Sequence, residues 1–381
     1  MYDFVLFENY YRAYNHYKDV CIIAEMLRYN GYSVAIADVF GEGENCQIEG
    51  VPHISFKRKC PVDVSKMYRC NVKYIRSIVN SVEEFCIDLY LRYVMRELAG
   101  KYRHLYAGSY FIKMTLGWLK LIPPASSVFF WGLRSSRLSE TKENAIQIRR
   151  YFDRNKNLKF FVSNNIIYEE FLSQGISPDR LVIRPERYIR ELTINERLNP
   201  DKYFNLLTIG TIRREKRIEL CLQALSLLKS KCVRYTIAGR AVKNEYETII
   251  ESQMSGMDNV IRINKRLSEE EYNSCIKDTD FLVLCDMQQD STVTNGTLAE
   301  ALLQGKPVIA PDYEPYKSII EAYGVGLLFD GDSAESLSKV IEEAAVKGAS
   351  FFRDNIIRYQ TSLLFETVSR QFGKDISLAI S

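Results

Sequence analysis

Short apolar runs alternate with longer amphipathic segments along this sequence, and the alternation occurs twice. Residues 307–310, for example, form an apolar run that is too short for a helix and is typical of a strand covered on both faces. Most segments between such runs are long enough for helices. Because strands connected through helices form parallel βαβ units, the alternation predicts α/β sheets with helices on both faces.

A polar, charged segment over residues 184–203 separates the two alternations. A chain of 381 residues is also too long for one compact core. We therefore expect two Rossmann-like, doubly wound parallel-sheet domains facing across a cleft, since such sheets bind ligands at the carboxyl ends of their strands. The expected boundaries are an N-terminal domain at 1–190, a linker at 191–203, a second domain at 204–348 and a C-terminal helical segment at 349–381 that packs back on the first domain.

Residues 295–312 read as a polar loop, a short helix and a buried strand. Asn295 or Thr297 is expected to cap the start of this helix, and Gly305 to end it in the left-handed conformation. Gly296 would let the backbone approach a ligand closely, where free amides and the helix dipole favour phosphate. An ordinary capping box between Thr297 and Glu300 explains the same pattern without a ligand.

Cysteine and histidine usage limits the possible chemistry. The nine cysteines form no C-x-x-C pair and only three histidines accompany them, so the sequence indicates neither a disulfide framework nor a zinc site. We see no signal-peptide pattern and no uninterrupted apolar stretch of about 18 residues, and we expect a cytoplasmic protein. No G-x-G-x-x-G follows the first apolar run, which disfavours a dinucleotide-dependent oxidoreductase.

Basic residues are concentrated in segment 91–120, where tyrosines and other aromatic residues lie between them. Such a patch fits an anionic membrane surface or a phosphate-bearing substrate, although a solvated helix face with tyrosines packed inward fits as well. We expect no nucleic-acid partner, because no binding motif is present and the pI is modest. The basic residues are Arg92, Arg96, Lys101, Arg103, Lys113 and Lys120, against Glu97 alone.

Five segments of the second half, at 206–216, 235–239, 259–270, 278–284 and 300–310, stand in a characteristic order. They include a strand–glycine–basic loop ending at Lys216, a strand ending in Gly239, and Glu300 followed by the helix and strand described above. In these segments the chain resembles the nucleotide-sugar-binding domain of retaining glycosyltransferases with the GT-B fold. The resemblance is to the group 1, family 4-like glycosyltransferases, which include bacterial polysaccharide glycosyltransferases. The first half resembles that family more weakly.

The resemblance implies roles for particular residues. Lys216 stands where the family binds the donor diphosphate, and Gly296 and Thr297 could donate backbone amides to the distal phosphate. Glu300 stands where the family binds ribose hydroxyls, which competes with the capping interpretation. The donor-binding residues expected in all are Gly210, Thr211, Arg213, Lys216, Lys265, Leu267, Thr294, Asn295, Gly296, Thr297 and Glu300, with Lys265 or Leu267 near the base.

The sequence departs from the family at three catalytic or phosphate-binding positions. The family's loop arginine is Thr211 here, and Arg213 could reach the same oxygens. The first glutamate of the family's glutamate pair is Thr292 here, and Thr294, Asp290 or Ser291 could substitute for it. The family's N-terminal histidine has no match in register, and His16 is the candidate that follows the first strand. Thr292 and His16 are therefore the candidate catalytic residues.

The function expected from the resemblance is retaining, metal-independent transfer of a sugar from a UDP- or GDP-linked donor to a glycan or lipid-diphosphate-linked acceptor. This would serve polysaccharide synthesis, with the enzyme peripheral at the inner membrane face. Two alternatives remain open. Thr211 and Thr292 are compatible with a GT-B-like partner or chaperone subunit that has lost transfer. A nucleotide-sugar epimerase or a phosphorylase has similar architecture, but three histidines and no recognisable pyridoxal lysine site disfavour both.

Overall fold

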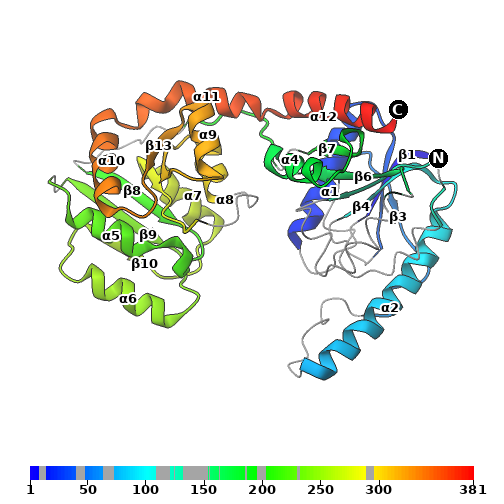
Figure 1. Ribbon diagram of the computed structural model, residues 1–381, viewed down its shortest axis with the longest axis horizontal. Coiled ribbons are helices and arrows are strands. Elements are labelled where there is room, and N and C mark those ends of the chain that lie inside the picture. The colour runs from blue at the N-terminus through cyan, green and yellow to red at the C-terminus, as the bar shows by residue number, and fades with distance from the viewer. Residues whose placement is uncertain are drawn as a thin grey trace. The chain divides into compact units, whose positions relative to one another are not determined.

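The computed structural model describes residues 1–7, 14–39, 48–62, 73–108, 121–123, 125–131, 153, 155–162, 164–184, 187–194, 203–229, 232–288 and 296–381, and within these ranges it does not define the side chains of 14–19, 73–81, 83–84 and 130–131. The chain divides into two compact units: unit 1 comprises Met1–Tyr188 with Glu366–Ser381, and unit 2 comprises Ile189–Phe365. Each unit contains one parallel sheet with helices packed on it (Figure 1). The expected α/β fold class with two parallel-sheet domains is confirmed.

Unit 1 is built on a seven-stranded sheet in the order β3-β2-β1-β4-β5-β6-β7. Its central strand β1 pairs with β2 through Phe4 and Val34, and with β4 through Phe4 and His104. The strands are β1 (Tyr2–Phe7), β2 (Val34–Ala37), β3 (His53–Ile54), β4 (Tyr102–Ala107), β5 (Val128–Trp131), β6 (Leu158–Val162) and β7 (Leu181–Ile183). The helices are α1 (Tyr14–Tyr29), α2 (Lys73–Leu98), α4 (Asn165–Ser173), the 3-10 turn η4 (Pro178–Arg180) and α12 (Phe365–Ile380).

Unit 2 repeats this winding with six strands in the order β10-β9-β8-β11-β12-β13. The strands are β8 (Phe204–Ile209), β9 (Val233–Ala238), β10 (Val260–Ile263), β11 (Phe281–Val283), β12 (Val308–Pro311) and β13 (Gly326–Phe329). The helices are α5 (Ile218–Ser226), α6 (Asn244–Met254), α7 (Glu269–Lys277), α8 (Gly296–Leu303), α9 (Tyr316–Tyr323), α10 (Ala334–Lys347) and α11 (Arg353–Ser362), with 3-10 turns η5 (Arg214–Lys216) and η6 (Ala349–Phe352). Strand order reverses at β8, which lies between β9 and β11, and this is where such sheets bind ligands.

The C-terminal segment corrects one expectation. The alternation predicted a single helix over residues 352–372, whereas the structure has α11 and α12, separated at Leu363 and Leu364. Helix α11 belongs to unit 2, and the chain enters unit 1 at Glu366. There the ring of Phe372 packs on that of Phe161 at 5.5 Å between centroids. The break arises because Phe365 donates its amide to Ile189 and Leu363 accepts the amide of Ile189, which takes these residues out of a continuous helix.

Two further details concern the expectations for unit 1. Cys21 on α1 is disulfide-bonded, although the sequence indicated no disulfide framework. The helices expected over 110–122 and 140–153 also fall mostly outside them. Within the described residues, no helix is long and apolar enough to cross a membrane.

Candidate functional site

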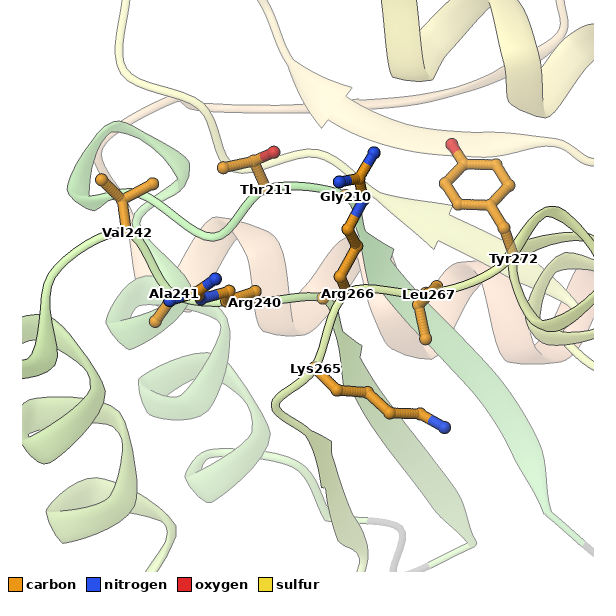
Figure 2. Close-up of a pocket in the computed structure, with 10 residues that line it drawn as sticks. Gly210, Thr211, Arg240, Ala241, Val242, Lys265, Arg266, Leu267 and Tyr272 are labelled. Atoms are coloured by element: carbon orange, nitrogen blue, oxygen red, sulfur yellow. The ribbon is translucent and has the colours of Figure 1, made fainter.

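A cavity of about 580 Å³ opens at the carboxyl ends of β8, β9 and β10 in unit 2 (Figure 2). Each of these adjacent parallel strands contributes the residues that follow it, because the carboxyl ends of parallel strands share one edge of the sheet. The lining residues are Gly210 and Thr211 after β8, Gly239, Arg240, Ala241 and Val242 after β9, Lys265, Arg266 and Leu267 after β10, and Tyr272 on α7.

Much of the cavity wall is backbone. Gly210 and Gly239 have φ of +105° and +130°, conformations that favour glycine. A Cβ placed on Gly239 would lie 1.9 Å from the carbonyl oxygen of Gly210, so the two loops touch through their main chains. Beyond these glycines, the Ile212 amide donates to the Arg240 carbonyl at 3.0 Å. The Ile212 carbonyl accepts a hydrogen bond from the Val242 amide, also at 3.0 Å. The strand pairing therefore continues into the wall of the cavity.

A buried ion pair supports this wall from behind. Arg262 on β10 donates to Glu247 on α6 through Nε at 2.8 Å and Nη2 at 2.7 Å, and both side chains are 9% exposed. Its Nη1 donates to the carbonyls of Ile237 and Gly239, at 3.0 and 2.9 Å. A guanidinium presents several donors in a fixed plane, so one side chain fixes both a neighbouring strand and the loop that lines the cavity.

Side chains at the mouth of the cavity point in different directions (Figure 2). Arg266 and Tyr272 extend on the side of Gly210, whereas Lys265 extends away from it. The Lys265 ammonium contacts Glu271, which also completes a capping box with Ser268 at the start of α7. Lys265 therefore lines the cavity with its stem while its charge is engaged on the α7 side.

A charged cluster forms where β8 and β11 run side by side. The Lys216 ammonium lies 4.0 Å from Oδ1 of Asp286, and both side chains are 12% exposed. Oδ2 of Asp286 accepts a hydrogen bond from the Tyr316 hydroxyl at 2.7 Å. Tyr313 donates to the Asp286 carbonyl. Burial raises the pKa of Tyr313 to about 12, so this hydroxyl remains a protonated donor at neutral pH.

Arg217 fixes the turn that carries Lys216. It adopts the left-handed conformation with φ +42°, which is uncommon for a residue with a side chain. Its Nε donates to the Cys285 carbonyl at 2.7 Å, and its Nη1 pairs with Asp332 at 2.6 Å. The Cys285 contact and the hydrogen bond from the Met287 amide to the Glu215 carbonyl at 2.7 Å tie the turn to the residues after β11, whereas the exposed Asp332 lies after β13.

Helix α8 starts at Gly296 and is followed by Gly305 in the left-handed conformation, with φ +76°, as expected. Since Gly296 is already helical, Thr297 lies inside the first turn of α8. Glu300 is half-buried, and one of its oxygens accepts a hydrogen bond from Gln304 at 3.1 Å.

The structure places Gly210, Thr211, Lys265 and Leu267, four of the candidate donor-binding residues, at one cavity. Arg213 is exposed beside Lys216. Four expected residues are not located: Thr292, Thr294 and Asn295 lie outside the described residues, and for His16 the structure gives the position in α1 but no side chain. Asp286 and Tyr316 were missed, because nothing in their own sequence context marks them.

Residues 189–360 match the family described as "Glycosyl transferases group 1". This part of the chain is a group 1 glycosyltransferase domain. The match contains the cavity, Lys216 and α8. The family expected from the five segments is therefore confirmed for this region.

Known structures agree with this assignment over both units. HepE of Anabaena in complex with UDP superposes with a TM-score of 0.64 at 12% identity, covering 98% of this chain and 99% of that chain. Sucrose-phosphate synthase from Thermosynechococcus elongatus gives 0.62 at 14% identity, with 98% of each chain covered. The lipopolysaccharide outer core galactosyltransferase WaaB gives 0.63 at 13% identity, covering 98% and 99%. At these identities the likeness establishes the GT-B fold; no curated protein sequence matches the chain.

Proposed function

We propose that this protein is a retaining glycosyltransferase that takes a sugar from a nucleoside-diphosphate donor and transfers it to a glycan or lipid-diphosphate-linked acceptor. The observation that carries the proposal is the cavity at the ends of β8, β9 and β10, inside the group 1 glycosyltransferase domain. HepE, which has the same fold, is known in complexes with UDP and with UDP-glucose, and this supports a nucleotide-sugar ligand.

In this proposal the base and ribose occupy the cavity, and the diphosphate lies toward Lys216 and the start of α8. Lys216 supplies a fixed cation, and the first amides of α8, at Gly296 and Thr297, supply donors aligned with the helix dipole. Glu300 accepts hydrogen bonds from the ribose hydroxyls. Charge that develops on the leaving diphosphate is stabilised by groups that are already in place, which is the most effective form of electrostatic catalysis.

Lys216 and the α8 amides supply positive charge without a metal ion, so we propose metal-independent transfer. For retention, an oxygen of the departing phosphate takes the proton of the acceptor hydroxyl while that hydroxyl oxygen bonds to the anomeric carbon. The new bond forms on the face that the phosphate leaves. Thr292 and Thr294 are the proposed contacts to the donor sugar, and His16 is the proposed catalytic contribution from unit 1.

A lipid-linked acceptor is supported by one face of α2. Val82, Phe85 and Leu89 are exposed on this helix at spacings of three and four residues, which places them on one stripe. Arg92 and Arg96 continue the same stripe toward the end of the helix, where Arg92 donates to Asp88 at 2.8 Å and Arg96 is exposed. Apolar side chains followed by arginines suit the boundary between acyl chains and anionic headgroups at the cytoplasmic membrane face. Of the tyrosines in the adjoining segment, Tyr102 and Tyr106 are buried and do not contribute.

Thermal unfolding with a panel of UDP, GDP, ADP, CMP and their sugar conjugates, with and without EDTA, tests the donor assignment. A ligand at a hundred times its dissociation constant should add about 2.7 kcal/mol to the free energy of unfolding. We expect one nucleotide class to stabilise the protein and EDTA to leave the shift unchanged. Loss of the shift in EDTA would contradict metal independence, and no shift with any nucleotide would contradict the donor site.

Vesicle flotation tests the membrane proposal. We expect binding to vesicles that contain anionic lipid, and weaker binding after Phe85→Ser. Phe351→Ser is the matched control, because Phe351 is an equally exposed phenylalanine in unit 2. If the fraction of protein bound to vesicles does not depend on anionic lipid content, or is unchanged by Phe85→Ser, a role for this face of α2 is contradicted.

A non-catalytic role is the second candidate, and Thr211 supports it because that residue lines the cavity where the family has an arginine. Release of nucleoside diphosphate from a stabilising nucleotide sugar in the presence of glycan or lipid acceptors separates the two. Binding without turnover over the acceptor panel would favour a partner subunit.

A further inference from the structure

Asp286 places a negative charge next to the lysine that the proposed function assigns to the donor diphosphate. The carboxylate is tightly held: Tyr316 donates to its Oδ2 at 2.7 Å, and its side chain is 12% exposed. A carboxylate so close to an anion site opposes anion binding. Several neighbouring contacts hold the Asp286 carboxylate at this position.

Three segments converge to fix the pair. The residues after β11 are tied to the Lys216 turn by the Met287–Glu215 hydrogen bond and by Arg217, which donates to the Cys285 carbonyl. Tyr316, the first residue of α9, orients the carboxylate itself. At 4.0 Å the ammonium and Oδ1 are beyond hydrogen-bond distance but well within the range of direct Coulomb attraction.

Resting on the proposed function, we propose that the Asp286 carboxylate, fixed beside Lys216, reduces the attraction of Lys216 for the free nucleoside diphosphate product. A nucleotide sugar carries roughly two negative charges on its diphosphate. The product has an additional terminal ionisation, with a pKa near 6 for a phosphate monoester, and so carries roughly one more. A fixed carboxylate beside the lysine therefore disfavours product more than donor, and it promotes release after transfer.

This role gives Asp286→Asn a signature that loss of structure cannot produce. Removing the negative charge leaves Lys216 less neutralised, so affinity for the nucleoside diphosphate should rise by about threefold to tenfold. Affinity for the corresponding nucleotide sugar should rise by a smaller factor. A merely structural aspartate would give weaker binding of both ligands.

Isothermal titration calorimetry on the full chain measures this. The probes are whichever of UDP, GDP and ADP binds the wild-type protein, together with its glucose conjugate. Asp332→Asn is the matched control, because it removes the same charge from a side chain that is 94% exposed and pairs with Arg217 rather than Lys216. We expect Asp332→Asn to leave both affinities unchanged and Tyr316→Phe, which keeps the charge, to change the donor-to-product ratio less than Asp286→Asn.

Each outcome has a definite meaning. A larger gain for the diphosphate than for the sugar conjugate in Asp286→Asn, restored toward wild type by Asp286→Glu, supports the inference. Equal or weaker binding of the diphosphate by a folded Asp286→Asn, or the same gain in Asp332→Asn, overturns it while leaving the donor site intact. Failure of the wild-type protein to bind any of the three nucleotides overturns the proposed function and this inference with it.

Discussion

The two sides of the candidate site in unit 2 are built in different ways. On the β9–β10 side the cavity wall is main chain, with Gly239 in contact with Gly210 and a buried Arg262–Glu247 pair behind it. On the β11 side the surface is formed by charged side chains, with Lys216 facing Asp286. Ligand binding on the β9–β10 side should therefore depend on the shape of the main-chain wall, and binding on the β11 side should depend on charge. Substitutions on the first side should therefore affect stability and binding together, and those on the second should affect binding alone.

The largest effect is expected for Gly239→Ala. The added Cβ would lie 1.9 Å from the Gly210 carbonyl oxygen, at a φ of +130° that side chains rarely adopt. Backbone strain and overpacking together should lower the free energy of unfolding by about 4 kcal/mol. Chemical denaturation measures this, with Gly256→Ala as control, because Gly256 has φ +85° but no atom within 4 Å of its added Cβ. Equal losses in the two variants would show that the close approach of the two loops is unimportant.

Glu247→Gln should have the next largest effect. It leaves the Arg262 guanidinium buried without its carboxylate, and breaking one partner of a buried pair typically lowers stability by about 3 kcal/mol or more. Since Arg262 also donates to the Gly239 carbonyl, nucleotide affinity should fall as well. Glu343→Gln, in the more exposed pair with Lys347, should change stability by only a few tenths of a kcal/mol. A stable Glu247→Gln protein with reduced affinity would assign the pair to binding alone.

Lys216→Ala tests the charged side of the site. We expect nucleotide-sugar affinity to fall by over tenfold, about 1.4 kcal/mol or more, with little change in the free energy of unfolding. Calorimetry with a stabilising nucleotide sugar provides the measurement, and Lys265→Ala is the control because that ammonium contacts Glu271. Unchanged affinity in a folded Lys216→Ala protein would remove Lys216 from the diphosphate site.

The smallest effect is expected at the capping box of α7, which carries Tyr272 at the cavity mouth. Ser268→Ala should lower stability by about 1 kcal/mol and leave nucleotide affinity unchanged. Lys265 and then the Ser268 amide lower the pKa of Glu271 below its usual value of 4.5. This carboxylate therefore stabilises the fold above that pH and loses its contribution as the pH falls through its folded pKa. Denaturation at pH 7 and at pH 3 should show the wild-type advantage over Glu271→Gln shrinking at the lower pH, because that substitution removes the carboxylate that binds Lys265 and the Ser268 amide.

Sequence patterning alone located most of the fold. Strands such as Phe204–Ile209 and Val233–Ala238 have the expected bounds, because an apolar run between turn residues has few other ways to fold. Ser268 with a glutamate three residues later indicates the capping box that the structure contains, and Gly305 is left-handed as expected, since both features depend on residues close in sequence. The break at Leu363 was not, because it depends on a hydrogen-bonded partner at Ile189, far away in the chain.

The same distinction applies to the site. The sequence by itself determined the two alternations, the glycines at the ends of strands, and Lys216 as the diphosphate candidate through local order and family resemblance. The tertiary structure decided that Asp286 meets both Lys216 and Tyr316, and that Arg262 donates to the Gly239 carbonyl. These contacts join residues that are distant in sequence, and they form because parallel pairing places β8 beside β11 and β10 beside β9 with all carboxyl ends at one edge.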